Sequence, residues 1–584
     1  MISAAAWIAR GKARQHPAKY AVDDAELARV AALANLQFDD AKATLHAAQM
    51  QMAGDGPEGD WRDDDDESGS EAGDAGMDDA PAVAAAKPDS NDPDDLSRYN
   101  LDTYDDEPVA STTGPFSNIK GLQYYRNNDE DPYITLKDDN ADEEEERQEL
   151  EVLPSDNLIV CAKTEDDVSL LECYVYASGD SNLYVHHDLM LPSFPLALEW
   201  LDYAPAGGPA AAADQNSAQK HGNYIAVGTM DPEIEVWSMD TVEGLYPDAI
   251  LGSRERTKDL GTQMSGTGKK KRRIPKKRVA NADYHVDAVL GLSWNRTARN
   301  LLASASADCT VKLWDLSRAP TGDGEGTYAL RSFDKIHTDK VQSVAWNTSG
   351  ANGGQPSVLL SGSYDKTMRV FDTRSPDVGV VARVAADVEA VRWNPWREHN
   401  FMASFEDGLV QSFDARMLSS AASPPAVTST LFTLSAHTGA CTSLDISPHI
   451  PGCIVTGGDD RTVKLWSIAE EGEAQKPKSI SMVASRDLDA GKIFSATFSP
   501  NDALTLAVAG SNGTLRIWDA LSNVGVRKTF GDRLRAMPAE LAPSLDAETR
   551  GDGVVMLADE GSEASDDDDE PLPADAEGDV AMEE

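Results

Sequence analysis

The stretch "ASASADCTVKLWDL", residues 303–316, contains two short strands of alternating apolar and polar residues joined by a turn at Asp308. Five other stretches repeat this pattern, with an aromatic residue where this one has Trp314. These aromatic residues are Trp237, Phe371, Phe413, Trp466 and Trp518. In chain order the six aromatic positions are 77, 57, 42, 53 and 52 residues apart. Since WD repeats recur about every 40–45 residues, the spacing predicts a WD-repeat protein with insertions between some repeats.

Each repeat also contains an earlier apolar strand, so that short strands separated by turns build one antiparallel, four-stranded blade. Residues 156–192 alternate and turn in the same way and supply a further blade upstream of the six. We therefore predict an all-β fold, a WD-repeat β-propeller of seven blades. The strand that completes the ring is expected from residues 122–136 or from residues 526–534.

Three repeats carry the side chains of a hydrogen-bonded chain of imidazole, hydroxyl, carboxylate and indole groups. In the first of them these are His285, Ser304, Asp308 and Trp314. The corresponding residues are His337, Ser361 and Asp365, with Phe371 replacing the indole, and His437, Thr456, Asp460 and Trp466. Because buried polar groups are stable only when they are hydrogen-bonded, we expect these residues to specify the fold.

The acidic residues of the chain, whose formal net charge is −48, are concentrated outside the repeats. Residues 51–150 contain 31 Asp and Glu against 7 Lys and Arg, and residues 551–584 contain 14 acids and no base. Such segments lack the apolar periodicity of a folded core and are expected to be disordered. The predicted domains are a helical N-terminal docking segment (1–52), an acidic linker with a short ordered block near 116–136 (53–150), the propeller (151–535) and an acidic tail (536–584).

Cysteine content and hydropathy indicate the compartment. Five cysteines at irregular spacing do not form a disulfide framework, which favours a reducing environment. The opening "MISAAAWIAR" has no basic region ahead of its apolar run, and the chain contains no run of 18 apolar residues. A cytosolic or nuclear protein without a membrane span is therefore expected.

Catalytic and metal-binding motifs give no positive signal. Neither a nucleophile elbow nor a His-Glu-x-x-His motif occurs, so an enzyme is not expected. The residues that come nearest to a metal-ligand set are His437, Cys441, His449 and Cys453. Since His437 belongs to a blade network and both cysteines fall on strands, we predict no metal site, no cofactor and no catalytic residue.

The N-terminal segment contains a helical pattern. Asp23 and Glu26 can form a capping box. One helical face then carries Leu27, Val30, Ala31 and Ala34. With a second helix expected at about 39–52, these short helices need a surface to pack on. We expect a partner protein to provide it, with Trp7 as the docking anchor, and packing within the chain is the alternative.

Eight basic residues fall within ten positions of this acidic chain: Lys269, Lys270, Lys271, Arg272, Arg273, Lys276, Lys277 and Arg278. They lie in a loop insertion, residues 253–284, between an outer strand and the next inner strand. Strand alternation places this loop on the face that holds the turns of Asp231, Asp308 and Asp365. We expect this basic arm to act as a nuclear-import signal, with RNA contact or pairing with the chain's own acidic segments as alternatives.

Several segments, most of them outside the WD repeats, match the sequences of a known protein family. They are Met1-Ile2, Trp7, Arg10-Gly11, Pro17, Lys19-Tyr20, Leu27, "TYDDE" at 103–107 and "IKGLQYYRNNDEDPYITL" at 119–136. Together with the WD repeats they resemble the periodic tryptophan protein 1 family, a eukaryotic nucleolar family implicated in maturation of the large ribosomal subunit. WD repeats alone occur in proteins of many functions, so the resemblance depends on the segments outside them.

The resemblance implies a non-catalytic scaffold in the nucleus and nucleolus that assists pre-rRNA processing and large (60S) subunit assembly. Its expected partners are the pre-60S particle, assembly-factor proteins and pre-rRNA. The alternative is a chromatin propeller whose acidic segments bind basic histones. Ser565, before "DDDDE", and Ser70, before "EAGD", suit an acid-directed kinase and are predicted phosphorylation sites.

Overall fold

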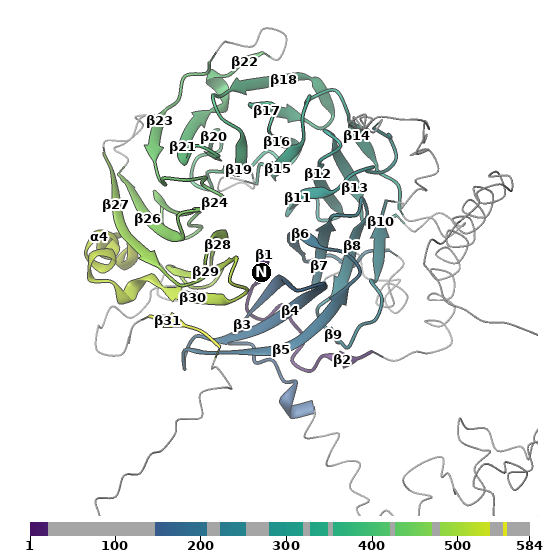
Figure 1. Cartoon of the computed structure of the whole chain (residues 1–584), viewed down its shortest axis with the longest axis vertical. Coiled ribbons are helices and arrows are strands. Elements are labelled where there is room, and N and C mark those ends of the chain that lie inside the picture. The colour runs from purple at the N-terminus through teal and green to yellow at the C-terminus, as the bar shows by residue number, and fades with distance from the viewer. Residues whose placement is uncertain are drawn as a thin grey trace, which may run out of the picture. The chain divides into compact units, whose positions relative to one another are not determined.

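Seven antiparallel sheets of four or five strands surround a central axis and form a seven-bladed β-propeller (Figure 1). The computed structural model describes residues 1–20, 147–206, 222–252, 280–318, 327–348, 354–420, 427–469, 479–537 and 553–557. All of these residues belong to one compact unit. The predicted fold class, an all-β WD-repeat propeller with seven blades, is confirmed.

Blades 1 and 2 contain the N-terminal residues. From the inside outward, blade 1 consists of β1 (Ile2–Ile8), β3 (Asn157–Glu165), β4 (Val168–Ala177) and β5 (Asn182–Leu191). Blade 2 consists of β6 (Pro195–Leu201), β7 (Tyr224–Thr229), β8 (Ile234–Ser238) and β10 (Ala249–Leu251). A short parallel pair, β2 (Ala18–Lys19) with β9 (Thr241–Val242), ties the N-terminal segment to blade 2.

Blades 3 to 5 follow in chain order. Blade 3 consists of β11 (Val289–Trp294), β12 (Leu301–Ser306), β13 (Val311–Asp315) and β14 (Arg331–Phe333). Blade 4 consists of β15 (Val341–Trp346), β16 (Val358–Ser363), β17 (Thr367–Asp372), β18 (Ser375–Arg383) and β22 (Ser419–Ser420). Blade 5 consists of β19 (Val388–Trp393), β20 (Asn400–Phe405), β21 (Leu409–Asp414) and β23 (Phe432–Ser435).

Blades 6 and 7 complete the ring. Blade 6 consists of β24 (Ser443–Ile446), β25 (Cys453–Gly457), β26 (Thr462–Ala469) and β27 (Ser479–Asp487). Blade 7 consists of β28 (Ile493–Phe498), β29 (Thr505–Gly510), β30 (Leu515–Asp519) and β31 (Val554–Val555). The helical elements that accompany these blades are η5 (Ala415–Met417), η6 (Ala520–Ser522) and α4 (Val524–Arg535).

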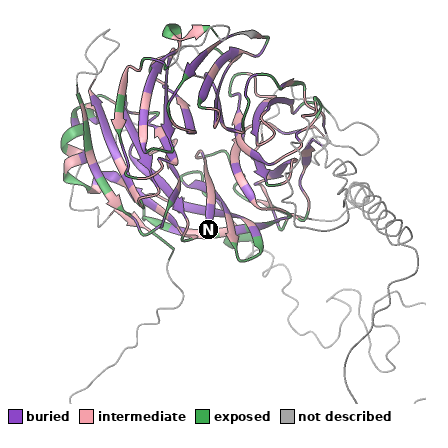
Figure 2. Cartoon of the chain, turned by 45° about the horizontal axis from the view of Figure 1, so that its top comes forward, coloured by how far each residue is buried: buried purple, intermediate pink, exposed green. Residues whose placement is uncertain are grey.

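The hydrophobic core is divided among the interfaces between neighbouring blades. Each pair of adjacent blades shares one cluster of buried side chains, and the second and third strands of every blade are buried along most of their length (Figure 2). Between blades 7 and 1, for example, Ile2 and Tyr174 pack with Ile517. Burying one large apolar side chain contributes about 1.5–3 kcal/mol, so each interface contributes substantially to the stability of the ring.

β1 is the innermost strand of blade 1 and lies between blades 7 and 2, and residues 526–534 do not supply a closing strand. Residues 122–136 lie outside the described residues. Residues 526–534 belong to helix α4, in which Val526, Phe530 and Leu534 recur at the helical spacing of four and are buried. The Asn523 side chain accepts a hydrogen bond from Gly525 N and caps this helix. A pattern with helical spacing and an N-cap cannot supply a strand, which requires a period of two.

The prediction that residues 1–52 form a helical docking segment is wrong for residues 1–20. In β1, Ala5 and Trp7 face blade 7, whereas Ala6 and Ile8 face blade 2. This alternation is that of a strand, and alanine fits where the innermost strands approach the axis. The helices expected at 23–34 and 39–52 lie outside the described residues. The same holds for the predicted block near 116–136.

The C-terminal boundary also differs from the predicted one. Residues 536–584 were expected to form an acidic disordered tail, but Val554 and Val555 pair with Trp518 and Ile517 as the outermost strand of blade 7. The sequence around them, "GVVMLA", is a short apolar run within an acidic segment. The remaining tail residues beyond Leu557 lie outside the described residues.

Candidate functional site

The polar network of blade 3 crosses the blade from its third strand to the loop before its first strand. Trp314 Nε1 donates to Ser304 Oγ at 2.8 Å, and Ser304 Oγ lies 2.6 Å from His285 Nε2. His285 Nδ1 lies 2.9 Å from Asp308 Oδ2. The Asp308 carboxylate also accepts hydrogen bonds from the Thr310 hydroxyl and from Thr310 N, at 2.7 and 2.9 Å. The structure thus brings together all four residues that were singled out in this repeat.

Blades 6 and 4 repeat this arrangement. In blade 6, Trp466 Nε1 donates to Thr456 Oγ1 at 2.9 Å, and His437 lies within 2.9 Å of both Thr456 and Asp460. In blade 4 the corresponding contacts of His337 are 2.7 Å to Ser361 and 3.0 Å to Asp365. Phe371 takes the place of the indole there and packs edge-on against Phe333. The network is therefore shorter by one member in blade 4.

The charge states within the networks follow from burial and hydrogen bonding. Burial lowers the pKa of His285, His337 and His437, because a charged imidazole would lose its hydration. Burial alone would raise the pKa of Asp308, but hydrogen bonds from His285 and Thr310 outweigh it and hold this pKa well below its usual range. A neutral imidazole therefore donates Nδ1–H to a carboxylate and accepts the hydroxyl proton at Nε2.

The other blades hold their aromatic residues differently. In blade 2, Trp237 Nε1 donates to Glu235 Oε2 of the same strand at 3.0 Å. In blade 5, Phe413 needs no hydrogen bond and stacks on Phe401 at 5.3 Å between ring centroids. In blade 7, Trp518 is 1% exposed, and its Nε1 has no hydrogen-bond partner. Three blades therefore carry the polar chain, and three use other contacts at the same position.

Trp7, the expected docking anchor, has an intramolecular position. Its Nε1 donates to Thr497 O of blade 7 at 3.3 Å, and its ring lies edge-on to Tyr176 of blade 1 with centroids 6.5 Å apart. The side chain is half-buried between these two blades. Trp7 therefore contributes to ring closure, and its role as an anchor for a partner stays a prediction.

Three basic residues after β1 form ion pairs with aspartates of different blades. Arg10 pairs with Asp502 of blade 7 at 2.8 Å and also donates to Ser178 of blade 1. Lys12 pairs with Asp202 at 3.1 Å, and the Arg14 guanidinium lies 3.6 Å from Asp240, both on blade 2. No motif in the sequence indicates these pairs. The one relevant signal is Arg10-Gly11, which is among the residues that resemble the periodic tryptophan protein 1 family.

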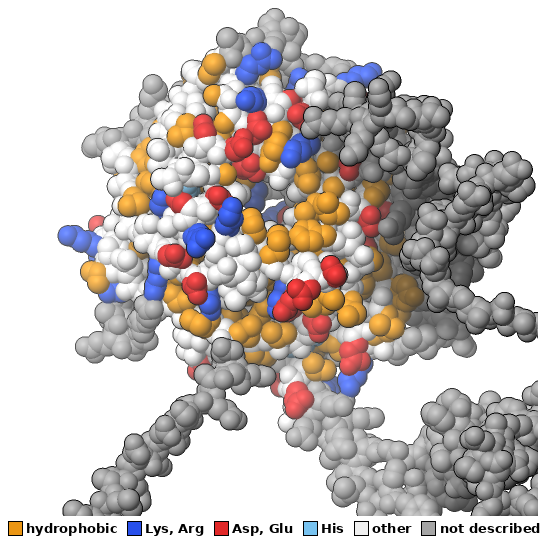
Figure 3. All heavy atoms as spheres, viewed as in Figure 1, with side chains coloured by type: hydrophobic (Ala, Val, Ile, Leu, Met, Phe, Trp, Pro, Cys, Tyr) orange, Lys and Arg blue, Asp and Glu red, His pale blue; other side chains and the backbone are white. Residues whose placement is uncertain are grey.

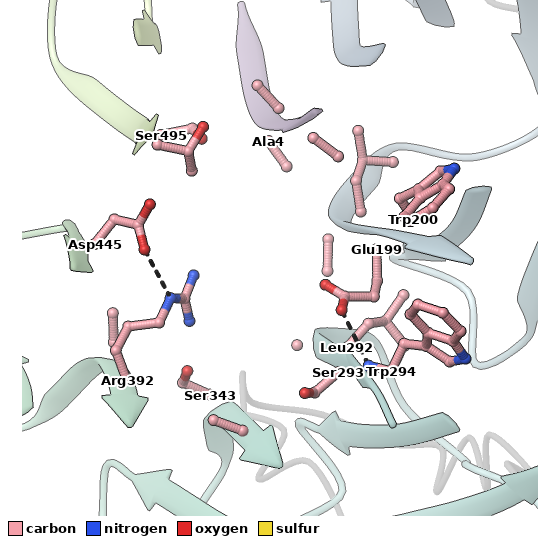
Figure 4. Close-up of a pocket in the computed structure, with 18 of the residues that line it drawn as sticks. Ala4, Glu199, Trp200, Leu292, Ser293, Trp294, Ser343, Arg392, Asp445 and Ser495 are labelled. Atoms are coloured by element: carbon pink, nitrogen blue, oxygen red, sulfur yellow. Dashed lines mark hydrogen bonds and ion pairs between the residues drawn. The ribbon is translucent and has the colours of Figure 1, made fainter. Parts of the chain in front are cut away.

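A cavity of about 790 Å³ lies at the centre of the ring (Figure 4). The face shown in Figure 3 is hollowed at its centre, and hydrophobic side chains gather along part of the rim. Inside the cavity, Arg392 Nε lies 4.0 Å from Asp445 Oδ1, and Glu199 lies on the wall beside Trp200 and Trp294. Burial raises the pKa of both Glu199 and Asp445.

Polar side chains of the cavity also link neighbouring blades. Glu199 Oε1 accepts from Trp294 N at 3.1 Å, and Asp445 Oδ2 accepts from Phe498 N at 2.9 Å. Ser293 makes the same kind of bond to Trp346 N at 3.2 Å. Asp445 and Ser293 directly precede the last residue of their innermost strands, and Glu199 lies two residues before the end of β6. Aligning the first strands at that position is the sequence signal that would have found these residues.

The basic arm lies outside the described residues, and so do Ser70 and Ser565. The ends of its loop are described at Gly252 and Ala280. After the loop, Val286 N donates to Asp308 Oδ2 at 3.2 Å. Before the loop, Gly252 lies against Pro232, in the turn that follows Asp231. Both ends of the insertion therefore lie beside the turns of Asp231 and Asp308.

The described residues contain no group of three or more His, Cys, Asp or Glu side chains arranged to hold a metal ion. His437 is engaged with Thr456 and Asp460, and Cys441 and Cys453 are buried on blade 6. His449 Nε2 lies 2.9 Å from Pro500 O. Within the same described segments, no helix is long and apolar enough to cross a membrane.

Fold and networks define the chain as a WD-repeat β-propeller protein. The family model "WD domain, G-beta repeat" matches residues 277–315, 329–372, 428–467 and 485–519, which correspond to blades 3, 4, 6 and 7. An uncharacterized WD repeat-containing protein of Schizosaccharomyces pombe is 39% identical, over 97% of this chain and 96% of that protein. Periodic tryptophan protein 1 of Saccharomyces cerevisiae is 35% identical, over 92% of this chain and 91% of that protein. The chain belongs to the periodic tryptophan protein 1 family.

Two partial similarities involve other propellers. Histone acetyltransferase type B subunit 2 of Candida glabrata is 25% identical over 42% of this chain and 56% of that protein. Ribosome biogenesis protein WDR12 homolog of Ixodes scapularis is 26% identical over 44% of this chain and 54% of that protein. Both matches cover less than half of this chain, as expected for proteins related through their WD repeats.

Proposed function

We propose that this protein is a non-catalytic nucleolar scaffold in ribosome biogenesis that assists pre-rRNA processing and large (60S) subunit assembly. The observation that carries the proposal is the similarity to Periodic tryptophan protein 1 over nearly the whole length of both chains. The partial similarity to a ribosome biogenesis protein supports it. A closed propeller offers two faces and a rim for several protein partners at once, which suits a scaffold that binds assembly factors and pre-ribosomal particles.

Purification of the tagged full-length chain from growing cells tests this function. We expect large-subunit precursor RNA and assembly proteins to co-purify, and the complex to sediment with pre-ribosomal particles. The alternative, a chromatin propeller, is favoured by the partial similarity to a histone acetyltransferase subunit. Recovery of histones without ribosomal precursor RNA would replace the first proposal with the second.

Within this function, the basic arm from Lys269 to Arg278 is proposed to direct nuclear import. Replacing its eight basic residues with glutamine is expected to leave the protein outside the nucleus, and fusing an unrelated import signal is expected to restore entry and particle association together. If the rescued protein enters the nucleus but sediments apart from pre-ribosomes, the arm contacts RNA, since each lost phosphate contact weakens binding. Nuclear entry of the unfused variant would exclude the import role.

A further inference from the structure

The turn after the second strand of blade 7 has the sequence "SNGT", residues 511–514. Asparagine followed by glycine is the pair that deamidates most readily, because glycine has no side chain to hinder attack by its backbone nitrogen. The chain contains this pair twice, and the other copy, residues 352–353, lies outside the described residues. The surroundings of Asn512 decide whether the reaction can occur in the folded protein.

The groups that would react are accessible and weakly held. The Asn512 side chain is exposed, and its Nδ2 donates to Asp489 O at 2.9 Å. Gly513 N donates to Gly510 O at 3.3 Å, which is longer than the usual range for a hydrogen bond. Gly513 has φ of 75°, a conformation that glycine adopts without strain. Neither the side-chain amide nor the backbone nitrogen beside it is therefore firmly fixed.

Blades 3, 4 and 6 have an aspartate at the position of Asn512, and each aspartate holds the threonine two residues later. In blade 3, Asp308 Oδ1 accepts from Thr310 Oγ1 at 2.7 Å and from Thr310 N at 2.9 Å. The corresponding threonine hydroxyls of blades 4 and 6 lie 2.6 and 2.8 Å from their aspartates. A carboxylate therefore closes this turn in three blades.

The threonine of the blade 7 turn lacks such an acceptor. Thr514 Oγ1 is buried and has no hydrogen-bond partner. In blade 3 the carboxylate uses one oxygen for Thr310 and the other for Val286 N. An amide has one acceptor oxygen and cannot replace both. A carboxylate at position 512 would supply the acceptor that Thr514 is missing.

We propose that Asn512 is a site of spontaneous deamidation, at which the folded chain converts the asparagine turn of blade 7 into the aspartate turn of blades 3, 4 and 6. Gly513 N bonds to Asn512 Cγ, the Cγ–Nδ2 bond breaks, and ammonia leaves with the amide proton of Gly513. Water then opens the succinimide ring. Addition of water at Cγ gives aspartate, and addition at the main-chain carbonyl carbon gives isoaspartate. Either product adds one negative charge.

The folded turn favours the aspartate product. Ser511 N donates to Lys492 O at 2.9 Å, and Asn512 N donates to Ala490 O at 3.1 Å. Isoaspartate would add a methylene to the main chain of this paired turn and displace the residues that follow. Aspartate leaves the main chain unchanged and gains the Thr514 hydroxyl as a donor. We therefore expect a larger share of aspartate in the folded chain than in an unfolded peptide of the same sequence.

Peptide mapping of the full-length chain tests the site. The purified protein is incubated in mildly alkaline water enriched in the heavy oxygen isotope, then digested with trypsin in ordinary water. Cleavage after Lys492 and Arg516 gives one peptide that contains both Asn512 and Asn501. Asn501 is the internal control, because an aspartate follows it and its Oδ1 accepts from Arg10 N at 2.9 Å.

We expect isotope-labelled deamidation at Asn512 to be at least about tenfold faster than at Asn501, and Gly513→Ala to slow it by a similar factor. This variant is expected to fold, because Cys309 has φ of 70° at the same position of blade 3. An intact Asn512, or equal rates at the two asparagines, would overturn the proposal. A share of aspartate no larger than in the synthetic peptide 507–518 would exclude a guiding role of the turn.

The second test concerns the closed turn itself and uses amide hydrogen exchange. Asn512→Asp reproduces the product, and we expect it to slow exchange at the Thr514 amide. The matched variant Asp308→Asn is expected to accelerate exchange at the Thr310 amide. If Thr514 exchanges equally fast in Asn512→Asp and in the natural chain, the carboxylate does not close the turn and the proposed conversion is wrong. The inference stands apart from the proposed cellular role, because every measurement is made on the purified chain.

Discussion

Blades 3 and 7 have the same strand order and the same tryptophan on the third strand, but the surroundings of that tryptophan differ. Ser304 lies opposite Lys312 and accepts from Trp314, whereas Val508, opposite Arg516, offers Trp518 no acceptor. At the turn, Asn512 replaces Asp308 as a side chain two positions before a threonine. A WD-repeat blade therefore keeps its shape after losing its polar chain, provided that neighbouring elements hold it.

The backbone of the turn after the second strand also differs between blades with and without a polar chain. In the three blades with a polar chain, Cys309, Lys366 and Arg461 have φ of 70°, 62° and 63°. In blades 5 and 7 the corresponding residues are Gly408 and Gly513, with φ of 79° and 75°. A left-handed conformation costs an ordinary residue about 1–2 kcal/mol. The carboxylate of the network accepts hydrogen bonds from one backbone N–H of the turn and one of the loop before the first strand, and these bonds offset the cost where glycine is missing.

The largest predicted effect concerns Trp7, which packs against blade 7, a blade that has no polar chain. Trp7→Ala is expected to destabilise the isolated chain by about 3 kcal/mol, the lower end of the range for buried aromatic residues, because Trp7 fills the interface between blades 7 and 1. Thermal unfolding of the purified protein measures this. The control is Leu245→Ala, at a residue 67% exposed, with an expected change below about 0.5 kcal/mol. Unchanged unfolding of Trp7→Ala would favour docking of a partner over ring closure as the role of Trp7.

The second prediction compares the two turns directly. Asp308→Ala leaves His285 and Thr310 without their acceptor, and an unsatisfied buried polar group costs about 1–3 kcal/mol. Asn512→Ala, at the corresponding position of blade 7, removes an exposed bond to Asp489 O and is expected to cost less than about 0.5 kcal/mol. Both variants are compared with the natural protein by thermal unfolding. Equal losses for the two would show that blade 3 does not depend on its polar chain.

Local sequence determined the repeats, and therefore the fold. Alternating strands, turns and the residues of the polar chains lie within short stretches, so His285, Ser304 and Asp308 could be aligned before their contacts were known. The number of blades followed in the same way. What a short stretch could not reveal was which distant segment completes a blade.

The missed elements all depend on contacts between residues far apart in the chain. Ala5 of β1 pairs with Cys161, and Val555 of β31 pairs with Ile517. The stretches "ISAAAWI" and "VV" have too few large apolar residues to predict a strand. Most of the stabilisation of these strands comes from the strands with which they pair. The central Glu199 was missed for a similar reason, since its acceptor role appears only when blade 3 lies beside blade 2.

The third prediction uses acid. Burial lowers the pKa of the three network imidazoles, and the His186 and His187 pKa values are lowered too, the latter to about 3. These groups bind more protons when unfolded, so stability is lost as pH falls below their unfolded pKa of about 6.5. We expect the midpoint temperature of thermal unfolding to decrease as the pH is lowered from 7.5 to 5.5. The decrease is expected to be smaller in His285→Gln. A midpoint that rises over this interval would contradict neutral imidazoles in blades 3, 4 and 6.

The last prediction exchanges the hydroxyl position between blades that have and lack the network, and it includes the smallest expected effect, the gain in Val508→Thr. Thr456→Val leaves Trp466 Nε1 and His437 Nε2 without partners, so a loss of about 1–3 kcal/mol is expected. Val508→Thr places a hydroxyl beside the unpartnered Trp518 Nε1. Its gain is expected to stay below about 1 kcal/mol, because one new hydrogen bond contributes about 0.5–1.5 kcal/mol and the added hydroxyl must itself be buried.

The quantity to measure is the difference between the stability lost in Thr456→Val and the stability gained in Val508→Thr. Thermal unfolding of both single variants and of the double variant measures it. Blade 6 has an imidazole to accept the hydroxyl proton, whereas blade 7 has Asp489 at the position of His437. If Val508→Thr gained as much as Thr456→Val lost, the hydroxyl alone would account for the network. We expect the loss to exceed the gain, because the hydroxyl stabilises a blade only as one member of a chain in which each donor has an acceptor.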